Sequence, residues 1–87
     1  MEIRGEITLF SRANDKLINF VDNDSETTFL RIIDKVTESF NNDYHSMKYK
    51  LSLLDEEGIY QTGVFMKNVG KDGIECLKDD FYWLFEN

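Results

Sequence analysis

Hydrophobic and polar residues alternate along the first part of the chain. From Glu2 to Leu9 the odd positions hold apolar side chains or glycine, and the even positions hold charged or hydroxyl side chains. This period of two is typical of a strand that buries one face. Turn-forming residues at 12–15 then precede a second run that contains isoleucine, phenylalanine and valine. We therefore predict a hairpin with strands near 2–11 and 16–22.

The spacing of apolar residues changes after position 25. Between Phe29 and Phe40 these residues recur at intervals of three and four, which places them on one side of a helix. Side-chain oxygens at 22–25 can accept the free amide hydrogens of a first helical turn, and the two asparagines at 41–42 favour a helix end. The pattern predicts a helix near 25–41.

Alternation returns in the second half of the chain. Apolar and polar residues take turns from Met47 onward, and Gly58 can supply the positive φ that many hairpin loops require. The pattern predicts strands near 46–54 and 59–67, followed by a loop at 68–71.

A second helix is indicated at 73–85. Asp72 and Glu75 have the spacing of a reciprocal cap, in which each side chain accepts a hydrogen bond from an amide near the helix start. An apolar stripe at helical intervals runs from Ile74 to Leu84. We expect this stripe to close the core.

The order of these elements defines the fold class. Two hairpins, each followed by a helix, give an α+β fold of order ββαββα, in one small domain that spans 1–87. Because hairpins dominate, we expect one mostly antiparallel four-stranded sheet with both helices on one face. The helix-covered face should carry Ile3, Ile7, Tyr49 and Leu51, and the open face Arg4, Glu6, Lys48 and Lys50.

Charge narrows the classes of partner. Seventeen acidic residues stand against ten basic ones, which gives a net charge of −7. This balance opposes direct binding to nucleic acid or to an anionic membrane and favours a basic protein partner, although net charge also serves solubility alone. A single cysteine, no secretory leader and no long apolar run lead us to expect a cytoplasmic protein.

The sequence offers little for catalysis. His45 and Cys76 are the only residues of their kinds, so neither an imidazole–thiolate dyad nor a zinc site can be assembled from neighbouring residues. Cys76 falls within a predicted amphipathic helix, where a small buried residue is the ordinary explanation. We expect no enzyme activity, no metal and no cofactor.

Two clusters are candidates for binding a partner. Carboxylates gather in the turn at 55–57 and again at 79–80, although a solvated surface is the simpler explanation for them. The aromatic run at 81–85 cannot face one direction on a helix, so part of it should be exposed as an anchor unless neighbouring strands wrap the helix end. The candidate partner-binding residues are Asp55, Glu56, Glu57, Asp79, Asp80, Tyr82 and Trp83.

These features support two main hypotheses. The first is a small acidic inhibitor that mimics nucleic acid and neutralises a basic partner such as a nuclease, in the manner of a phage anti-defence protein or a toxin-immunity protein. The second is an assembly subunit that docks through its aromatic helix. Homodimerisation through that surface or through an exposed strand edge is a third, compatible hypothesis.

Overall fold

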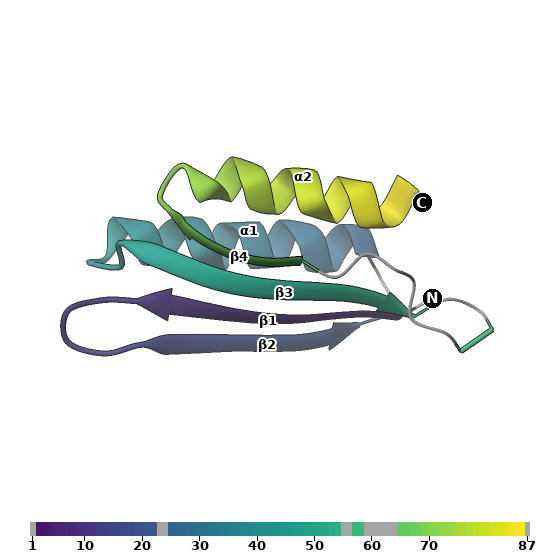
Figure 1. Ribbon diagram of the computed structural model, residues 1–87, viewed down its shortest axis with the longest axis horizontal. Helices are drawn as coiled ribbons and strands as arrows, with labels where there is room; N and C mark the ends of the chain where they lie inside the picture. Colours follow the sequence, from purple (N-terminus) through teal and green to yellow (C-terminus); the bar gives the residue numbers. More distant parts are fainter. Residues whose placement is uncertain (1, 23–24, 55–56, 59–64, 87) are drawn as a thin grey trace.

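The chain forms one antiparallel sheet with two helices packed on one face (Figure 1). The computed structural model describes residues 2–22, 25–54, 57–58 and 65–86. The elements in chain order are β1 (Glu2–Phe10), β2 (Lys16–Asp22), α1 (Ser25–Asn41), β3 (Ser46–Leu54), β4 (Phe65–Gly70) and α2 (Gly73–Glu86). The predicted ββαββα order and α+β class are confirmed.

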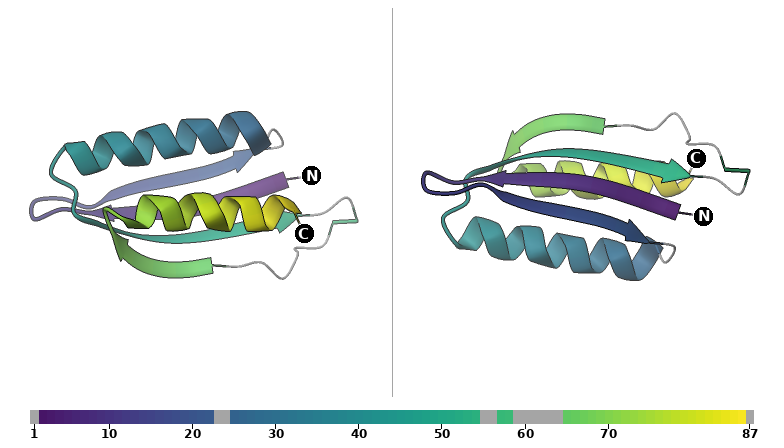
Figure 2. Two further views of the ribbon diagram at one scale, coloured as in Figure 1. Left: turned by 90° about the horizontal axis from the view of Figure 1, so that it is seen from above. Right: turned by 90° about the horizontal axis from the view of Figure 1, so that it is seen from below.

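The sheet has the strand order β2-β1-β3-β4. β1 therefore lies in the interior of the sheet and pairs antiparallel with both β2 and β3. The two helices run side by side on the same face, and the opposite face is open (Figure 2). Neither helix in the ranges given above is long and apolar enough to cross a membrane.

A glycine at the centre of β1 allows an aromatic ring to lie against the backbone. Gly5 pairs with Phe20 on one side and Leu51 on the other. A Cβ atom at position 5 would lie 2.2 Å from ring atoms of Phe20, far inside contact distance. The absence of a side chain at Gly5 thus leaves the space that the Phe20 ring occupies under the helices.

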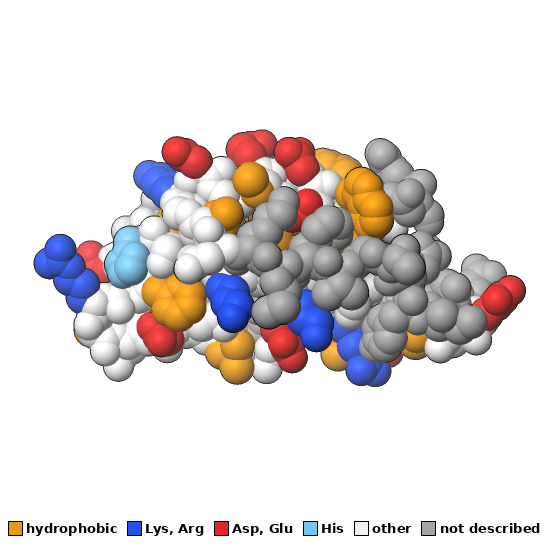
Figure 3. All heavy atoms as spheres, in the orientation of Figure 1, with side chains coloured by type: hydrophobic (Ala, Val, Ile, Leu, Met, Phe, Trp, Pro, Cys, Tyr) orange, Lys and Arg blue, Asp and Glu red, His pale blue; other side chains and the backbone are white. Residues whose placement is uncertain are grey.

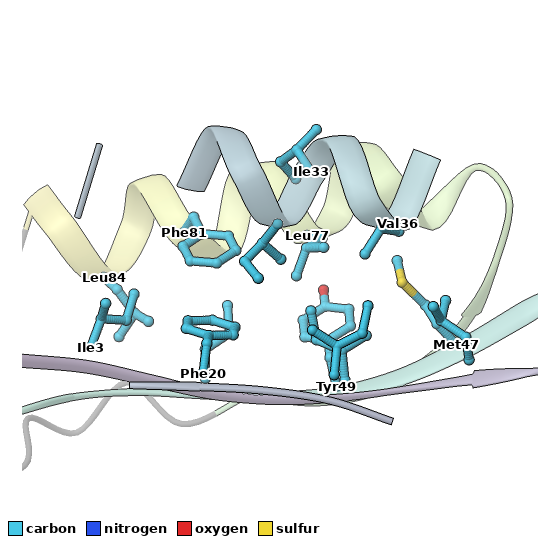
Figure 4. Packing of buried hydrophobic residues seen from close by; sticks show 14 of the residues in the cluster. Ile3, Phe20, Ile33, Val36, Met47, Tyr49, Leu77, Phe81 and Leu84 are labelled. Carbon is cyan, nitrogen blue, oxygen red and sulfur yellow. The ribbon is translucent and has the colours of Figure 1, made fainter. Parts of the chain in front are cut away.

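The core lies between the sheet and the helices (Figure 4). The four side chains predicted to face the helices are all at most 1% exposed. Phe81 of α2 contacts aromatic rings of three other residues, with centroid distances of 5.2 Å to Phe29, 6.0 Å to Phe20 and 5.9 Å to Phe85. The buried hydrophobic residues are Ile3, Ile7, Leu9, Ile18, Phe20, Ile32, Ile33, Val36, Phe40, Met47, Tyr49, Leu51, Leu53, Leu77, Phe81 and Leu84.

The last strand differs from its predicted position. We expected a strand at 59–67 and a loop from 68, whereas β4 continues to Gly70. Val69 and Gly70 pair with the first residues of β3, so pairing with a complete neighbouring strand outweighs the low strand propensity of asparagine and glycine in this segment. Positions 59–64 lie outside the described residues.

Candidate partner-binding face on helix α2

The outward side of α2 combines acidic and aromatic side chains. Glu75, Asp79 and Tyr82 follow one another at helical intervals of four and three, which places them on one side of the helix. Trp83 is adjacent to Tyr82. Glu75 and Asp79 are exposed, and Tyr82 and Trp83 are 53% and 44% exposed. We refer to these four residues as the acid–aromatic face.

The acid–aromatic face is visible on the molecular surface. Acidic side chains gather over the upper side of the molecule in Figure 3, where Figure 1 places α2. Hydrophobic side chains lie beside them toward the C-terminal end of this helix. Of the two alternatives for the aromatic run, the structure agrees with the exposure of Tyr82 and Trp83, and their role as anchors stays a prediction.

Contacts with α1 hold the tyrosine of this face in place. The Tyr82 ring lies 5.2 Å from the Phe29 ring, at an interplanar angle of 50°. Phe29 in turn packs edge-on against the buried Phe81 ring. An aromatic side chain that is half exposed and already packed on one side loses little conformational freedom when a partner covers it. Tyr82 is therefore suited to serve as an anchor.

The charge of α2 is strongly negative. The helix sequence contains four carboxylates and one lysine. That lysine, Lys78, forms an ion pair with Glu75 at 3.2 Å, and the Glu75 side chain is 76% exposed. An exposed pair of this kind contributes little to stability and is weakened by salt. The Glu75 carboxylate thus stays accessible to a basic group on a partner.

The open face of the sheet has a different character. Arg4, Glu6, Lys48 and Lys50 are exposed there, as predicted, and Arg4 forms an ion pair with Glu2 at 2.9 Å. Positive and negative side chains are mixed on this face, whereas carboxylates dominate α2. The acid–aromatic face is therefore the more acidic of the two surfaces.

Asp80 does not belong to the exposed acids, which corrects its predicted place on a solvated helix surface. It is only 7% exposed, and the hydroxyl of Tyr49 on β3 donates a hydrogen bond to its Oδ2 atom at 2.5 Å. Asp80 follows Leu77 by three positions and precedes Leu84 by four, so it falls on the buried stripe of α2. A partner cannot contact this carboxylate without opening the core.

The Tyr49–Asp80 pair also changes the chemistry of the tyrosine. Burial, followed by the hydrogen bond to Asp80, raises the pKa of Tyr49 well above its ordinary value. The physical cause is that loss of the phenolic proton would place a second negative charge beside a carboxylate in a region that excludes water. This partner of Asp80 could not be predicted from local sequence patterns, because residues 49 and 80 meet only in the folded chain.

The turn acids are described only in part. Glu57 is exposed and precedes Gly58, whose φ of 82° matches the predicted turn conformation. Asp55 and Glu56 lie outside the described residues. The acid–aromatic face is therefore defined by α2 alone.

Metal-binding and nucleophilic groups are sparse. Within 2–22, 25–54, 57–58 and 65–86, no three histidine, cysteine, aspartate or glutamate side chains are close enough to hold a metal ion. Cys76 is a half-buried free thiol on α2, and His45 is an exposed residue just before β3.

Three exposed apolar residues are not among the candidate binding residues named from the sequence. Leu17 and Val21 on β2 and Leu30 on α1 are 61%, 60% and 57% exposed. The exposure of Leu17 and Val21 could be predicted from the sequence, because they alternate with the buried Ile18 and Phe20 and so lie on the open face of the sheet.

The chain matches no protein-family model, no curated protein and no solved structure.

Proposed function

We propose that this protein is a small, acidic, non-catalytic binding protein that neutralises a basic protein partner. The partner class that fits best is a nucleic-acid-binding protein such as a nuclease, because its phosphate-binding lysines and arginines would accept carboxylates in place of phosphates. The observation that carries the proposal is the position of two exposed acids, Glu75 and Asp79, beside two exposed aromatic residues on one face of α2.

The two kinds of residue have separate roles in this proposal. At physiological ionic strength, charges are screened over about 8 Å, so Glu75 and Asp79 act by direct contact with basic groups. Tyr82 and Trp83 supply apolar area at the centre of the contact, where aromatic residues contribute most to affinity. The turn acids Asp55, Glu56 and Glu57 remain in the proposal as a second acidic segment, on sequence grounds.

The charge of the face can be tested by reversal. With the partner captured from the native host by the intact chain, we expect the double substitution Glu75→Lys and Asp79→Lys to weaken binding by about tenfold or more. Binding of the unmodified protein should weaken as salt is raised. Titration calorimetry at two ionic strengths measures both effects.

A matched control exists on the other helix. Asp34 and Glu38 are exposed on α1 and have the same spacing of four, so Asp34→Lys with Glu38→Lys makes the same change in net charge at another place. This control should leave affinity within about twofold, since surface substitutions outside a contact have small effects. Equal losses in both double variants would show a general charge effect and contradict a contact at α2.

The alternative function is an assembly subunit that docks through its aromatic helix. The exposure of Tyr82 and Trp83 favours it directly, because an apolar dock needs no acids. In that case Trp83→Ala would raise the dissociation rate while the double charge reversal and the salt concentration left affinity almost unchanged. This combination of results would replace the acidic inhibitor with the assembly subunit.

A further inference from the structure

β2 is an edge strand with an uninterrupted backbone. It pairs with β1 on one side and ends the sheet on the other. The pairing with β1 runs without a bulge from Asp22 to Lys16, and the strand contains no proline, no glycine and no charge between its two end residues. Natural edge strands commonly carry bulges, prolines or charged side chains that prevent pairing with another chain. The interior of β2 has none of these.

The open face of β2 is also apolar. Leu17 and Val21 are the two most exposed large hydrophobic residues described in the protein, at 61% and 60%, and they flank the exposed Asn19. Their neighbours on β1 are Thr8 and Arg4, which cover little of them. Among the described residues, the outer backbone edge of β2 pairs with no other strand, and the strand presents two apolar side chains beside that edge.

The sequence of β2 is complementary to itself when two copies run antiparallel. In a register centred on Asn19, residues whose numbers sum to 38 lie opposite one another. Leu17 then faces Val21 of the second copy, and the buried positions Ile18 and Phe20 face each other in the same way. The two ends pair Lys16 with Asp22, which carry opposite charges. Each of these pairs occurs twice because of the symmetry.

We propose that the protein forms a twofold homodimer in which β2 pairs with β2 of a second copy in this register. The result is one continuous eight-stranded sheet, four strands from each copy. Residues directly opposite each other on two antiparallel strands have side chains on the same face of the sheet. A register shifted by one residue would therefore place buried positions opposite exposed ones and is disfavoured. The twofold axis is perpendicular to the sheet, and all four helices lie on one side.

The environment of Asp22 is compatible with this arrangement. Its Oδ2 atom accepts a hydrogen bond from Thr28 at 2.6 Å and contacts Arg31 at 3.4 Å, and its side chain is 33% exposed. These contacts hold the carboxylate at the end of β2, where Lys16 of the second copy would approach. Arg31 repels that lysine in part, so the end pairs mainly select the register, and the backbone and apolar pairs supply most of the affinity.

The proposal is tested by two double variants that differ in one residue. Leu17→Lys with Val21→Lys places like charges opposite each other in both symmetric pairs, and we expect the dimer dissociation constant to rise by about tenfold or more. Leu17→Lys with Val21→Glu places opposite charges in the same two pairs and should restore most of the affinity. Sedimentation equilibrium over a wide concentration range measures both constants, and far-ultraviolet circular dichroism verifies the fold.

Each outcome decides the proposal. Leu30→Lys also removes an exposed apolar residue, but from α1, and should leave the dimer constant within about twofold. A monomeric unmodified protein at every concentration would overturn the dimer. An unchanged constant in the lysine–lysine variant would move the interface away from β2, and failure of the lysine–glutamate variant to recover affinity while folded would overturn the register. The acid–aromatic face lies on α2, so these variants test the dimer independently of the proposed function.

Discussion

Replacement of Phe81 by alanine is expected to lower the free energy of unfolding by about 3 to 5 kcal/mol. The Phe81 side chain is fully buried and contacts rings from the sheet, from α1 and from its own helix. Its removal leaves a cavity that three neighbours cannot fill together. Since small domains are stable by only about 5 to 15 kcal/mol, the variant should be unfolded in part at physiological temperature. Urea denaturation followed by circular dichroism measures the change.

Leu30→Ala provides the control for this prediction. Leu30 is 57% exposed on α1, and alanine is a good helix former, so the expected change is within about 0.5 kcal/mol. A loss below about 1 kcal/mol for Phe81→Ala, or equal losses in the two variants, would show that Phe81 is not central to the core.

Replacement of Tyr49 by phenylalanine is expected to lower stability by about 1.5 to 3 kcal/mol at neutral pH, because it removes a buried hydrogen bond to a carboxylate. The ring stays in place, so little packing is lost. Tyr82→Phe removes a hydroxyl from a tyrosine that is 53% exposed and should change stability by at most about 0.5 kcal/mol. Chemical denaturation of the three proteins at one pH compares these effects.

The same substitution should also change how stability depends on alkaline pH. The pKa of Tyr49 is raised above 10.0 in the folded protein, so below pH 10 both folded and unfolded chains hold the phenolic proton. Above pH 10 the unfolded chain loses this proton while the folded chain keeps it, and stability falls by up to about 1.4 kcal/mol per pH unit for this one group. Tyr49→Phe removes that contribution. Parallel stability profiles of the two proteins above pH 10 would contradict the buried pair.

Much of the fold could be predicted because its local patterns are consistent. The alternation in β1 and β3 and the helical spacing in α1 each define one buried face, and the structure confirms those faces. β4 was placed less well because its extent depends on pairing with β3 and on no strong pattern of its own. Asn68 and Gly70 are poor strand formers, so the propensities of these residues alone indicated a loop.

The candidate site was predicted only in part, because the burial of Asp80 on α2 depends on how the helix packs against the sheet. The aromatic run of α2 indicated that Tyr82 and Trp83 would be exposed once Phe81 and Leu84 faced the core, and they are. Asp80 was misplaced because a carboxylate on the buried side of a helix is acceptable only when a donor faces it. Tyr49 is that donor, and its approach depends on how the sheet and α2 pack.

The position of β1 within the sheet has a consequence for synthesis on the ribosome. Gly5 of β1 pairs with Leu51 of β3, so the two interior strands are separated along the chain by β2 and the whole of α1. The first hairpin can form as soon as it emerges, and α1 can then pack on its apolar face, but the other backbone edge of β1 has no partner until β3 follows. Contacts between such distant segments form slowly because the intervening chain must first be ordered into a loop. The nascent chain thus leaves this edge of β1 unpaired for the time needed to make its second half, which is when binding by a chaperone would protect it most.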